Sequence, residues 1–234
     1  MNLFFYYFFL FFIYCIIGWC VETIYVAINT KKFVDRGFLI GPYCPIYGFS
    51  CLGIVLYLTQ YKDNFVTIFI LGVVICSIFE YFTSYIMEKL FKTRWWDYSH
   101  KKFNLNGRIC GFNSLLFGVG SLLVIYIIQP FLDLFLLRLN NKVFLGLNVI
   151  CLILFIVDTI ISFSVANKFK HTITNLDVKK DSTLEFTKLV RETIQNNNKI
   201  FQKRLLLAFP NIDLEKLIIL KNELEDDIKE LLNK

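Results

Sequence analysis

Residues 3–28 read LFFYYFFLFFIYCIIGWCVETIYVAI, and this stretch decides the fold class. Only one ionisable carboxylate, Glu22, interrupts the apolar run, whereas about 20 apolar residues are enough for a helix to cross a bilayer. No lysine or arginine precedes the run, and no small-residue cleavage site follows it, so it differs from a signal peptide. The sequence therefore predicts a retained membrane-spanning helix.

The whole chain has the composition of a membrane protein. Of its 234 residues, 56% are hydrophobic, 18% are aromatic and only 19% are charged, which is more apolar than an ordinary soluble domain. We expect an all-α, polytopic membrane helix bundle of about five spans within a transmembrane domain at 1–167, followed by a cytoplasmic helical tail at 168–234. The predicted spans are 3–28, 44–61, 65–90, 112–132 and 143–166. Pro130 is expected to break the end of the fourth span.

The distribution of basic residues predicts the orientation in the membrane. The loops after the first and third spans hold eight lysines and arginines, whereas the opposite loops hold three: Lys62, Arg138 and Lys142. Basic loops face the cytoplasm. We therefore expect a multi-pass protein of the cell membrane with its N-terminus outside and its tail in the cytoplasm. Because membrane orientation explains the net charge of +6, the partner predicted is the lipid bilayer and not a nucleic acid.

The tail has the pattern of a helical hairpin or a short coiled coil. A capping box, STLE, lies at 182–185, and apolar residues then recur at helical spacing. After an interruption at 208–211, leucines and isoleucines form a series of the a/d type. Two interpretations remain open: packing of the tail on itself or on the membrane domain, and association with a coiled-coil partner.

Ionisable residues inside apolar spans are the first candidates for a functional site. An aspartate, lysine or arginine at the centre of a span costs about 2.5–3.5 kcal/mol, so Glu22, Glu80 and Asp158 need partners or water. Arg36 and Arg108 lie in the loops at the same predicted side. We expect these residues to form a cluster at the cytoplasmic boundary. Three interpretations of the cluster remain open: a structural ion-pair network, a substrate or proton path, and an acid/base site at the lipid interface.

The loop at 91–111 adds a second group of candidates. Its aromatic and basic residues are typical of an anchor at the lipid headgroups. Trp96, Asp97, Asn106 and Arg108 add polar groups that anchoring does not require, and Gly107 is expected to form a turn. The sharper hypothesis is that this loop contacts a headgroup or a substrate.

No recognisable catalytic or nucleotide-binding motif accompanies these residues. The chain contains no HExxH, GxSxG or phosphate-loop sequence, so an enzyme is the less favoured interpretation and an ATP-driven role would require a separate ATPase subunit. Seven cysteines without a CxxC pair, and two histidines outside the predicted spans, predict neither a metal site nor a cofactor.

Four motifs resemble those of a known family: GWxxE at 18–22, RGFLxGPxCPIYG at 36–48, WDYS at 96–99 and NxNGRIC at 104–110. They are similar to the CmpB-type family of bacterial integral membrane proteins, which is described as ABC-transporter permeases and includes small vertebrate transmembrane proteins. The resemblance covers about residues 5–130. Phe117 departs from it, because family members often have a tryptophan there. The resemblance implies membrane embedding, a shared polar site and a permease role, and it supplies no substrate.

Together these patterns predict a transporter permease subunit with a polar site near the cytoplasmic boundary. Its predicted substrate-binding residues are Glu22, Arg36, Glu80, Trp96, Asp97, Asn106 and Arg108, with Asp158 as a weaker member. Two alternatives stay open: an interfacial lipid-modifying enzyme that uses the same residues, and a membrane scaffold that recruits a partner through its tail.

Overall fold

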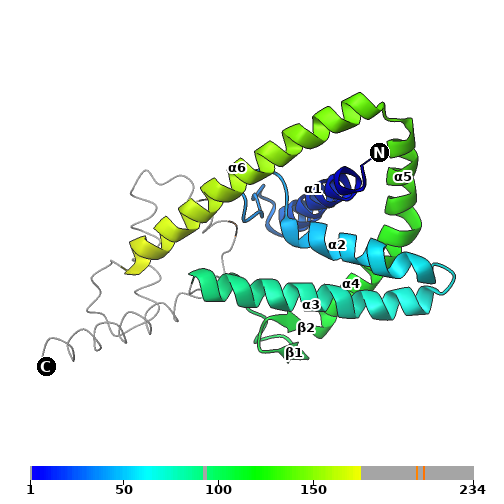
Figure 1. The fold of residues 1–234 in the computed structure, drawn as a ribbon. Coiled ribbons are helices and arrows are strands. Elements are labelled where there is room, and N and C mark those ends of the chain that lie inside the picture. Colours follow the sequence, from blue (N-terminus) through cyan, green and yellow to red (C-terminus); the bar gives the residue numbers. More distant parts are fainter. Residues whose placement is uncertain (1, 92–93, 175–203, 205–207, 209–234) are drawn as a thin grey trace, which may run out of the picture.

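The computed structural model describes residues 2–91 and 94–174, together with Arg204 and Ala208. The described chain is an all-α bundle with one small β-hairpin (Figure 1). Its helices are α1 (Leu3–Thr30), α2 (Pro45–Leu58), α3 (Phe65–Phe91), α4 (Gly111–Leu123), α5 (Gln129–Arg138) and α6 (Asn141–Thr174). Strands β1 (Asn104–Leu105) and β2 (Ile109–Cys110) form the antiparallel hairpin. Apart from Arg204 and Ala208, the predicted hairpin or coiled coil of the tail lies outside the described residues.

Local chemistry explains where α1 begins and ends. The side chain of Asn2 accepts a hydrogen bond from the backbone N–H of Phe4 at 2.9 Å, which caps the first turn. At the other end, Lys31 adopts a left-handed conformation with φ 54°, and its N–H donates to the carbonyl of Ala27 at 2.8 Å. The apolar run quoted above is therefore one uninterrupted helix.

Four helices of the described residues are long and apolar enough to cross a membrane: Leu3–Ile28, Phe65–Phe91, Gly111–Arg138 and Asn141–Lys168. The segment predicted as the second span, 44–61, differs from them. It forms only the 14-residue helix α2, which a 3₁₀ turn at Thr59–Tyr61 extends. Pro45 lies in the first turn of α2, where its missing N–H has no helical partner to lose.

The prediction that Pro130 ends the fourth helix is wrong. The helix changes to a π-helix at Val124–Ile128 and then continues as α5 to Arg138. A proline inside a helix lacks a donor and clashes with the carbonyl four residues earlier, and a π-turn relieves both problems by widening the coil. The consequence is a bend, so that α4 and α5 run in different directions (Figure 1).

Small residues allow the helices to approach closely. A Cβ at Gly18 of α1 would lie 2.2 Å from the ring of Tyr47 in α2, and one at Gly72 of α3 would lie 2.2 Å from Oγ of Ser121 in α4. Gly118 of α4 fits in the same way against Phe69 of α3, where a Cβ would lie 2.6 Å from the ring. Such contacts are the usual basis of helix packing in membranes.

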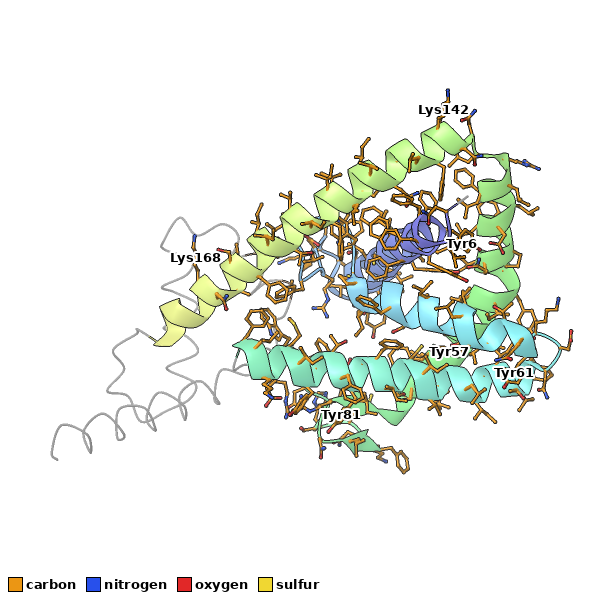
Figure 2. The ribbon with its side chains drawn as sticks, viewed as in Figure 1. Tyr6, Tyr57, Tyr61, Tyr81, Lys142 and Lys168 are labelled. Atoms are coloured by element: carbon orange, nitrogen blue, oxygen red, sulfur yellow. The ribbon has the colours of Figure 1, made fainter. Side chains whose placement is uncertain are left out.

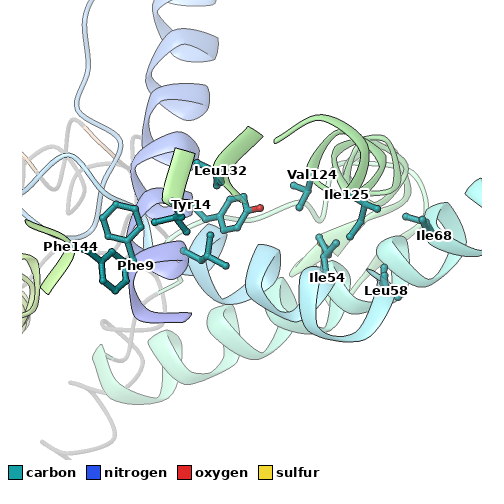
Figure 3. Close-up of a cluster of buried hydrophobic side chains, with 12 residues drawn as sticks. Phe9, Tyr14, Ile54, Leu58, Ile68, Val124, Ile125, Leu132 and Phe144 are labelled. Carbon is teal, nitrogen blue, oxygen red and sulfur yellow. The ribbon is translucent and has the colours of Figure 1, made fainter. Parts of the chain in front are cut away.

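The main apolar core lies where these helices meet (Figure 3). It joins Tyr14 of α1 and Ile54 of α2 to Ile68 of α3, and Val124 and Leu132 close it from the bent α4–α5 helix. This core fixes how α1, α2, α3 and α4 are rotated relative to one another.

Helix α6 lies along the outside of the bundle (Figure 1). It packs on α1 through Phe144, whose ring centroid lies 5.5 Å from that of Phe9, and through Phe155, at 5.5 Å from Phe11. Lys142 and Lys168 lie near its two ends (Figure 2), and the helix rises about 39 Å from one to the other. Most of the apolar side chains between the lysines are exposed, as expected for a helix that faces lipid.

The α3–α4 contact leads to a test of the packing. Gly118→Ala places a methyl group against Phe69 and should lower the stability by about 1–3 kcal/mol. Gly120→Ala in the same helix meets nothing within 4 Å and should leave the stability unchanged or raise it by up to about 1 kcal/mol. Thermal unfolding of the detergent-solubilised variants measures the difference, and equal melting temperatures would contradict this packing.

Candidate functional site

The two predicted basic loops come together at one end of the bundle. Phe38, from the loop between α1 and α2, packs against Phe91 at the end of α3, against Trp95 in the following loop and against Phe163 of α6, with centroids 5.3–5.7 Å apart. These four rings join segments that are far apart in the sequence.

Glu22 and Arg36, two members of the predicted cluster, form an ion pair. The Nε of Arg36 lies 3.7 Å from Oε2 of Glu22, and the Tyr47 hydroxyl donates to Oε1 of Glu22 at 2.7 Å. Tyr47 reaches this position because Gly18 leaves room for its ring. The ion pair is long, and both side chains are partly exposed.

Glu80 lies close to this pair and is almost completely buried. It belongs to a stripe of α3 in which every fourth residue, from Ile68 to Ser84, is buried. The Tyr98 hydroxyl donates to Oε1 of Glu80 at 3.3 Å. Burial raises the pKa of Tyr98, and the neighbouring carboxyl groups of Glu80 and Glu22 act in the same direction. The Tyr98 hydroxyl therefore stays protonated at neutral pH and can donate to a carboxyl oxygen.

Arg108 binds a carboxylate that the predicted site did not include. Its Nη2 lies 2.9 Å from Oε2 of Glu88, and its Nη1 donates to Oγ of Ser84 at 3.2 Å. The guanidinium also lies 5.6 and 5.4 Å from the ring centroids of Tyr81 and Tyr85, a cation–π arrangement. The available signal was the helical spacing, because Ser84 and Glu88 follow Glu80 at intervals of four residues.

The β-hairpin presents Arg108 to α3. Asn106 and Gly107 form its turn with φ 53° and 66°, the left-handed values of a type I′ turn, so the predicted turn at Gly107 is confirmed. A Cβ at Gly107 would lie 2.3 Å from Oδ1 of Asp97, so the glycine lets the hairpin turn approach the preceding segment of the loop. The Trp96 indole N–H donates to the carbonyl of Arg108 at 3.1 Å, which connects the same segment to the hairpin.

Asp97 organises the loop before the hairpin. Its Oδ1 accepts hydrogen bonds from the backbone N–H and the hydroxyl of Ser99, at 3.0 and 2.7 Å, and lies 3.3 Å from Nη1 of Arg94. Burial opposes ionisation, but these donors outweigh it and hold the pKa of Asp97 below its ordinary value. Arg94 also pairs with Glu88 at 3.3 Å, so the loop and α3 share one ionic network.

Asp158 accepts hydrogen bonds from the backbone and from hydroxyl groups, and its predicted place as a weaker member of the substrate site stays a prediction. It binds no arginine among the described residues, and instead accepts from the backbone N–H groups of Ile40 and Gly41, at 3.0 and 2.7 Å, and from the Tyr43 hydroxyl at 2.5 Å. Ser162 donates to the same carboxylate at 2.8 Å. Asp158 therefore attaches α6 to the loop that carries Arg36.

A tail residue holds the other side of this loop. Nη1 of Arg204 lies 2.7 Å from Oδ2 of Asp35, and the guanidinium donates to the carbonyls of Gly37 and Phe38 at 3.1 and 2.9 Å. Oδ1 of Asp35 accepts from the indole N–H of Trp19 at 2.7 Å. In addition, Arg36 donates to the carbonyl of Ala208. The sequence carried no signal for Arg204, because nothing in its neighbourhood predicts a partner 169 residues away.

A second polar cluster lies toward the N-terminal end of α1, and the sequence analysis missed it. Asp133 accepts from the Tyr6 hydroxyl at 2.7 Å and from Gln129 at 2.8 Å, while the Tyr14 hydroxyl donates to Gln129 at 2.7 Å. Tyr6 and Glu22 are separated by about 24 Å along α1. Figure 2 shows Tyr6 beside α5 and Tyr81 at the hairpin end. Polar groups therefore lie at both ends of the apolar core.

Comparison with known proteins identifies the family. The family described as "Putative ABC-transporter type IV", of the CmpB type, matches residues 9–163, which is more than half of the chain. The chain belongs to this family. No curated protein and no solved structure matches it.

The CmpB-type match runs from α1 into α6 and therefore includes both basic loops. Of the seven predicted residues, Glu22, Arg36 and Glu80 gather around Tyr47 and Tyr98, while Trp96, Asp97 and Arg108 belong to the hairpin network. The remaining one, Asn106, donates to the Tyr81 hydroxyl at 3.0 Å. Their role in binding a substrate stays a prediction. Among the described residues, no three histidine, cysteine, aspartate or glutamate side chains gather in a way that could hold a metal ion.

The ionic network of the hairpin can be tested by a double-mutant cycle. Glu88→Gln leaves Arg94 and Arg108 without their shared partner, whereas Arg108→Gln leaves Glu88 with Arg94. We expect Glu88→Gln to be the more damaging change, up to the 3–5 kcal/mol typical of a broken buried pair, and the double variant to lose less than the sum. Thermal unfolding in detergent measures this, with Lys101→Gln on the exposed loop as control. Additive losses would contradict the pairing.

The attachment of α6 by Asp158 gives a separate prediction. Asp158→Asn replaces an acceptor with a donor opposite the N–H groups of Ile40 and Gly41, and a hydrogen bond to a charged group is worth about 1.5–3 kcal/mol. Amide exchange in a peptide covering 38–43 should therefore accelerate roughly tenfold or more. Asp133→Asn, in the other polar cluster, is the matched control and should leave that peptide unchanged. Equal exchange in both variants would contradict the attachment.

Proposed function

We propose that this chain is a multi-pass subunit of a transporter, the permease component, with its polar site at the cytoplasmic boundary. The proposal is supported by its membership of the CmpB-type family and by the apolar helices that meet at a charged end. In this proposal the loops at 31–44 and 92–110 face the cytoplasm.

The basic loops support the proposed orientation, because both lie at the same end of the bundle and contact each other through Phe38 and Trp95. Helix α2 packs against α3 over most of its length (Figure 1). Together with its 3₁₀ turn it rises about 27 Å, near the lower limit for crossing a bilayer. Counted as a span, it gives five crossings, an outside N-terminus and a cytoplasmic tail.

The observation that carries the proposal is the meeting of Glu22, Arg36 and Glu80 from α1, the first basic loop and α3. The Glu22–Arg36 pair is long at 3.7 Å and partly exposed, whereas Arg108 is held at 2.9 Å from Glu88 and by three other groups. We therefore assign the exchangeable contact to Glu22 and Arg36, and a positioning role to Arg108. The carboxylates pair with Arg36 in one state and with cargo or a coupling ion in another.

The proposed energy source is a separate ATPase subunit, because the sequence contains no phosphate-binding loop. The tail belongs to the same proposal as a site of self-association or of partner binding on the cytoplasmic side. Arg204 supports this assignment, because its contacts with Asp35, Gly37 and Phe38 connect the tail to the loop that carries Arg36.

The decisive experiment is affinity purification of the full chain from its native membranes, followed by mass spectrometry and an ATP-hydrolysis assay. We expect a nucleotide-hydrolysing subunit to co-purify. We also expect Glu22→Gln, which weakens the exchangeable pair, to lower the hydrolysis rate of the complex roughly tenfold, equivalent to about 1.4 kcal/mol of barrier.

Asp63→Asn is the matched control, because Asp63 is an exposed carboxylate in the turn between α2 and α3. This variant should recover the same subunit at the same rate. Purification of the chain without any ATPase, but with a tightly bound lipid, would contradict the permease assignment and favour lipid handling.

A further inference from the structure

Glu80 has an incomplete set of partners. The residue is only 7% exposed, and its Oε2 has no hydrogen-bond partner among the described residues. The other oxygen, Oε1, accepts a hydrogen bond from the Tyr98 hydroxyl at 3.3 Å. A buried, ionised carboxylate usually accepts several hydrogen bonds or faces a cation. The surroundings of Glu80 therefore do not supply the partners that its ionised form requires.

The arginines at this end of the bundle pair with other carboxylates. Arg94 and Arg108 bind Glu88, Arg36 binds Glu22, and Arg204 binds Asp35. Within the described part of the chain, no cation forms an ion pair with Glu80.

The groups that face Glu80 are neutral or negative. From α1 comes Glu22, whose charge has the same sign, and from α2 comes Tyr47, whose hydroxyl points to Glu22. The loop after α3 contributes Tyr98. Helix α4 has no charged residue, and it meets α3 through neutral groups such as Ser114, which accepts a hydrogen bond from Ser77 at 2.9 Å.

An ionised carboxylate in this setting would be costly, because burial without a cation disfavours the charged form and a like charge adds to the effect. The neutral acid avoids the larger part of this cost. We propose that Glu80 is a proton-binding site, with its proton held at neutral pH. A proton binds to the carboxyl oxygen itself and therefore requires no cavity.

The proton has a direct consequence for the proposed transporter. Its release to water would leave a second negative charge beside Glu22, which attracts Arg36 and the loop that carries it. Proton binding and the position of this loop are then coupled, and Asp158 and Arg204 transmit the change to α6 and the tail. This step rests on the proposed function, whereas the protonation of Glu80 does not.

Infrared spectroscopy of the purified full-length protein tests the site directly, since the carbonyl stretch of a protonated carboxyl differs from that of a carboxylate. At neutral pH the wild type should show a protonated carboxyl band, Glu80→Gln should lose it, and Asp63→Asn should keep it. A wild type without the band, or a band undiminished in Glu80→Gln, overturns the proposal.

Two further measurements keep the test decisive. If Glu80→Gln does not fold, Tyr98→Phe removes a hydrogen bond to the carboxyl and should shift the band. An unshifted band overturns the assignment. Because the folded state binds a proton that the unfolded state releases at neutral pH, stability should fall as the pH rises. Glu80→Gln should flatten this dependence, and an unchanged dependence overturns the proposal.

These readouts do not involve an ATPase. A protonated Glu80 in a chain that purifies without an ATPase supports this inference while contradicting the proposed function. Recovery of the ATPase together with an ionised Glu80 supports the proposed function and contradicts this inference.

Discussion

The segment between α1 and α2 is held from two sides by opposite charges, and the polar end of the molecule depends on this arrangement. Asp158 accepts from its N–H groups at Ile40 and Gly41, while Arg204 donates to its carbonyls at Gly37 and Phe38. An irregular segment offers backbone N–H and carbonyl groups that no helix satisfies, and these side chains bind them. The same contacts attach α6 and the tail to the bundle and place Arg36 beside Glu22.

Charge pairing divides this end into two parts with different properties. The hairpin network around Glu88 is compact, since two arginines share one carboxylate and two tyrosine rings cover Arg108. The part around Glu22 is looser, with one long ion pair, two tyrosine hydroxyls and an incompletely bonded Glu80. Buried ion pairs whose hydrogen bonds are all formed are typical of structural roles. A buried carboxyl group with too few hydrogen-bond partners, next to a long ion pair, is typical of a binding site.

The apolar core connects the two polar clusters, so that a movement of the helices at one end is transmitted to the other. Tyr14 belongs both to that core and to the cluster with Gln129, and the helices meet through glycine contacts that admit no extra methyl group. The π-turn before Pro130 bends the fourth helix so that α5 reaches Tyr6. Tightly packed elements of this kind move as units rather than deforming continuously.

The sequence by itself determined the helical membrane class, the apolar segments and the turn at Gly107, because composition, period and turn chemistry act over short distances along the chain. It did not predict that the fourth helix continues past Pro130 through a π-turn, that Arg108 pairs with Glu88, or that Asp158 binds backbone N–H groups. Only the tertiary structure decided these, because they depend on how the helices rotate and pack. Helix rotation determines which buried carboxylate each donor can reach, and residues as distant as Arg204 and Asp35 meet only after the chain has folded.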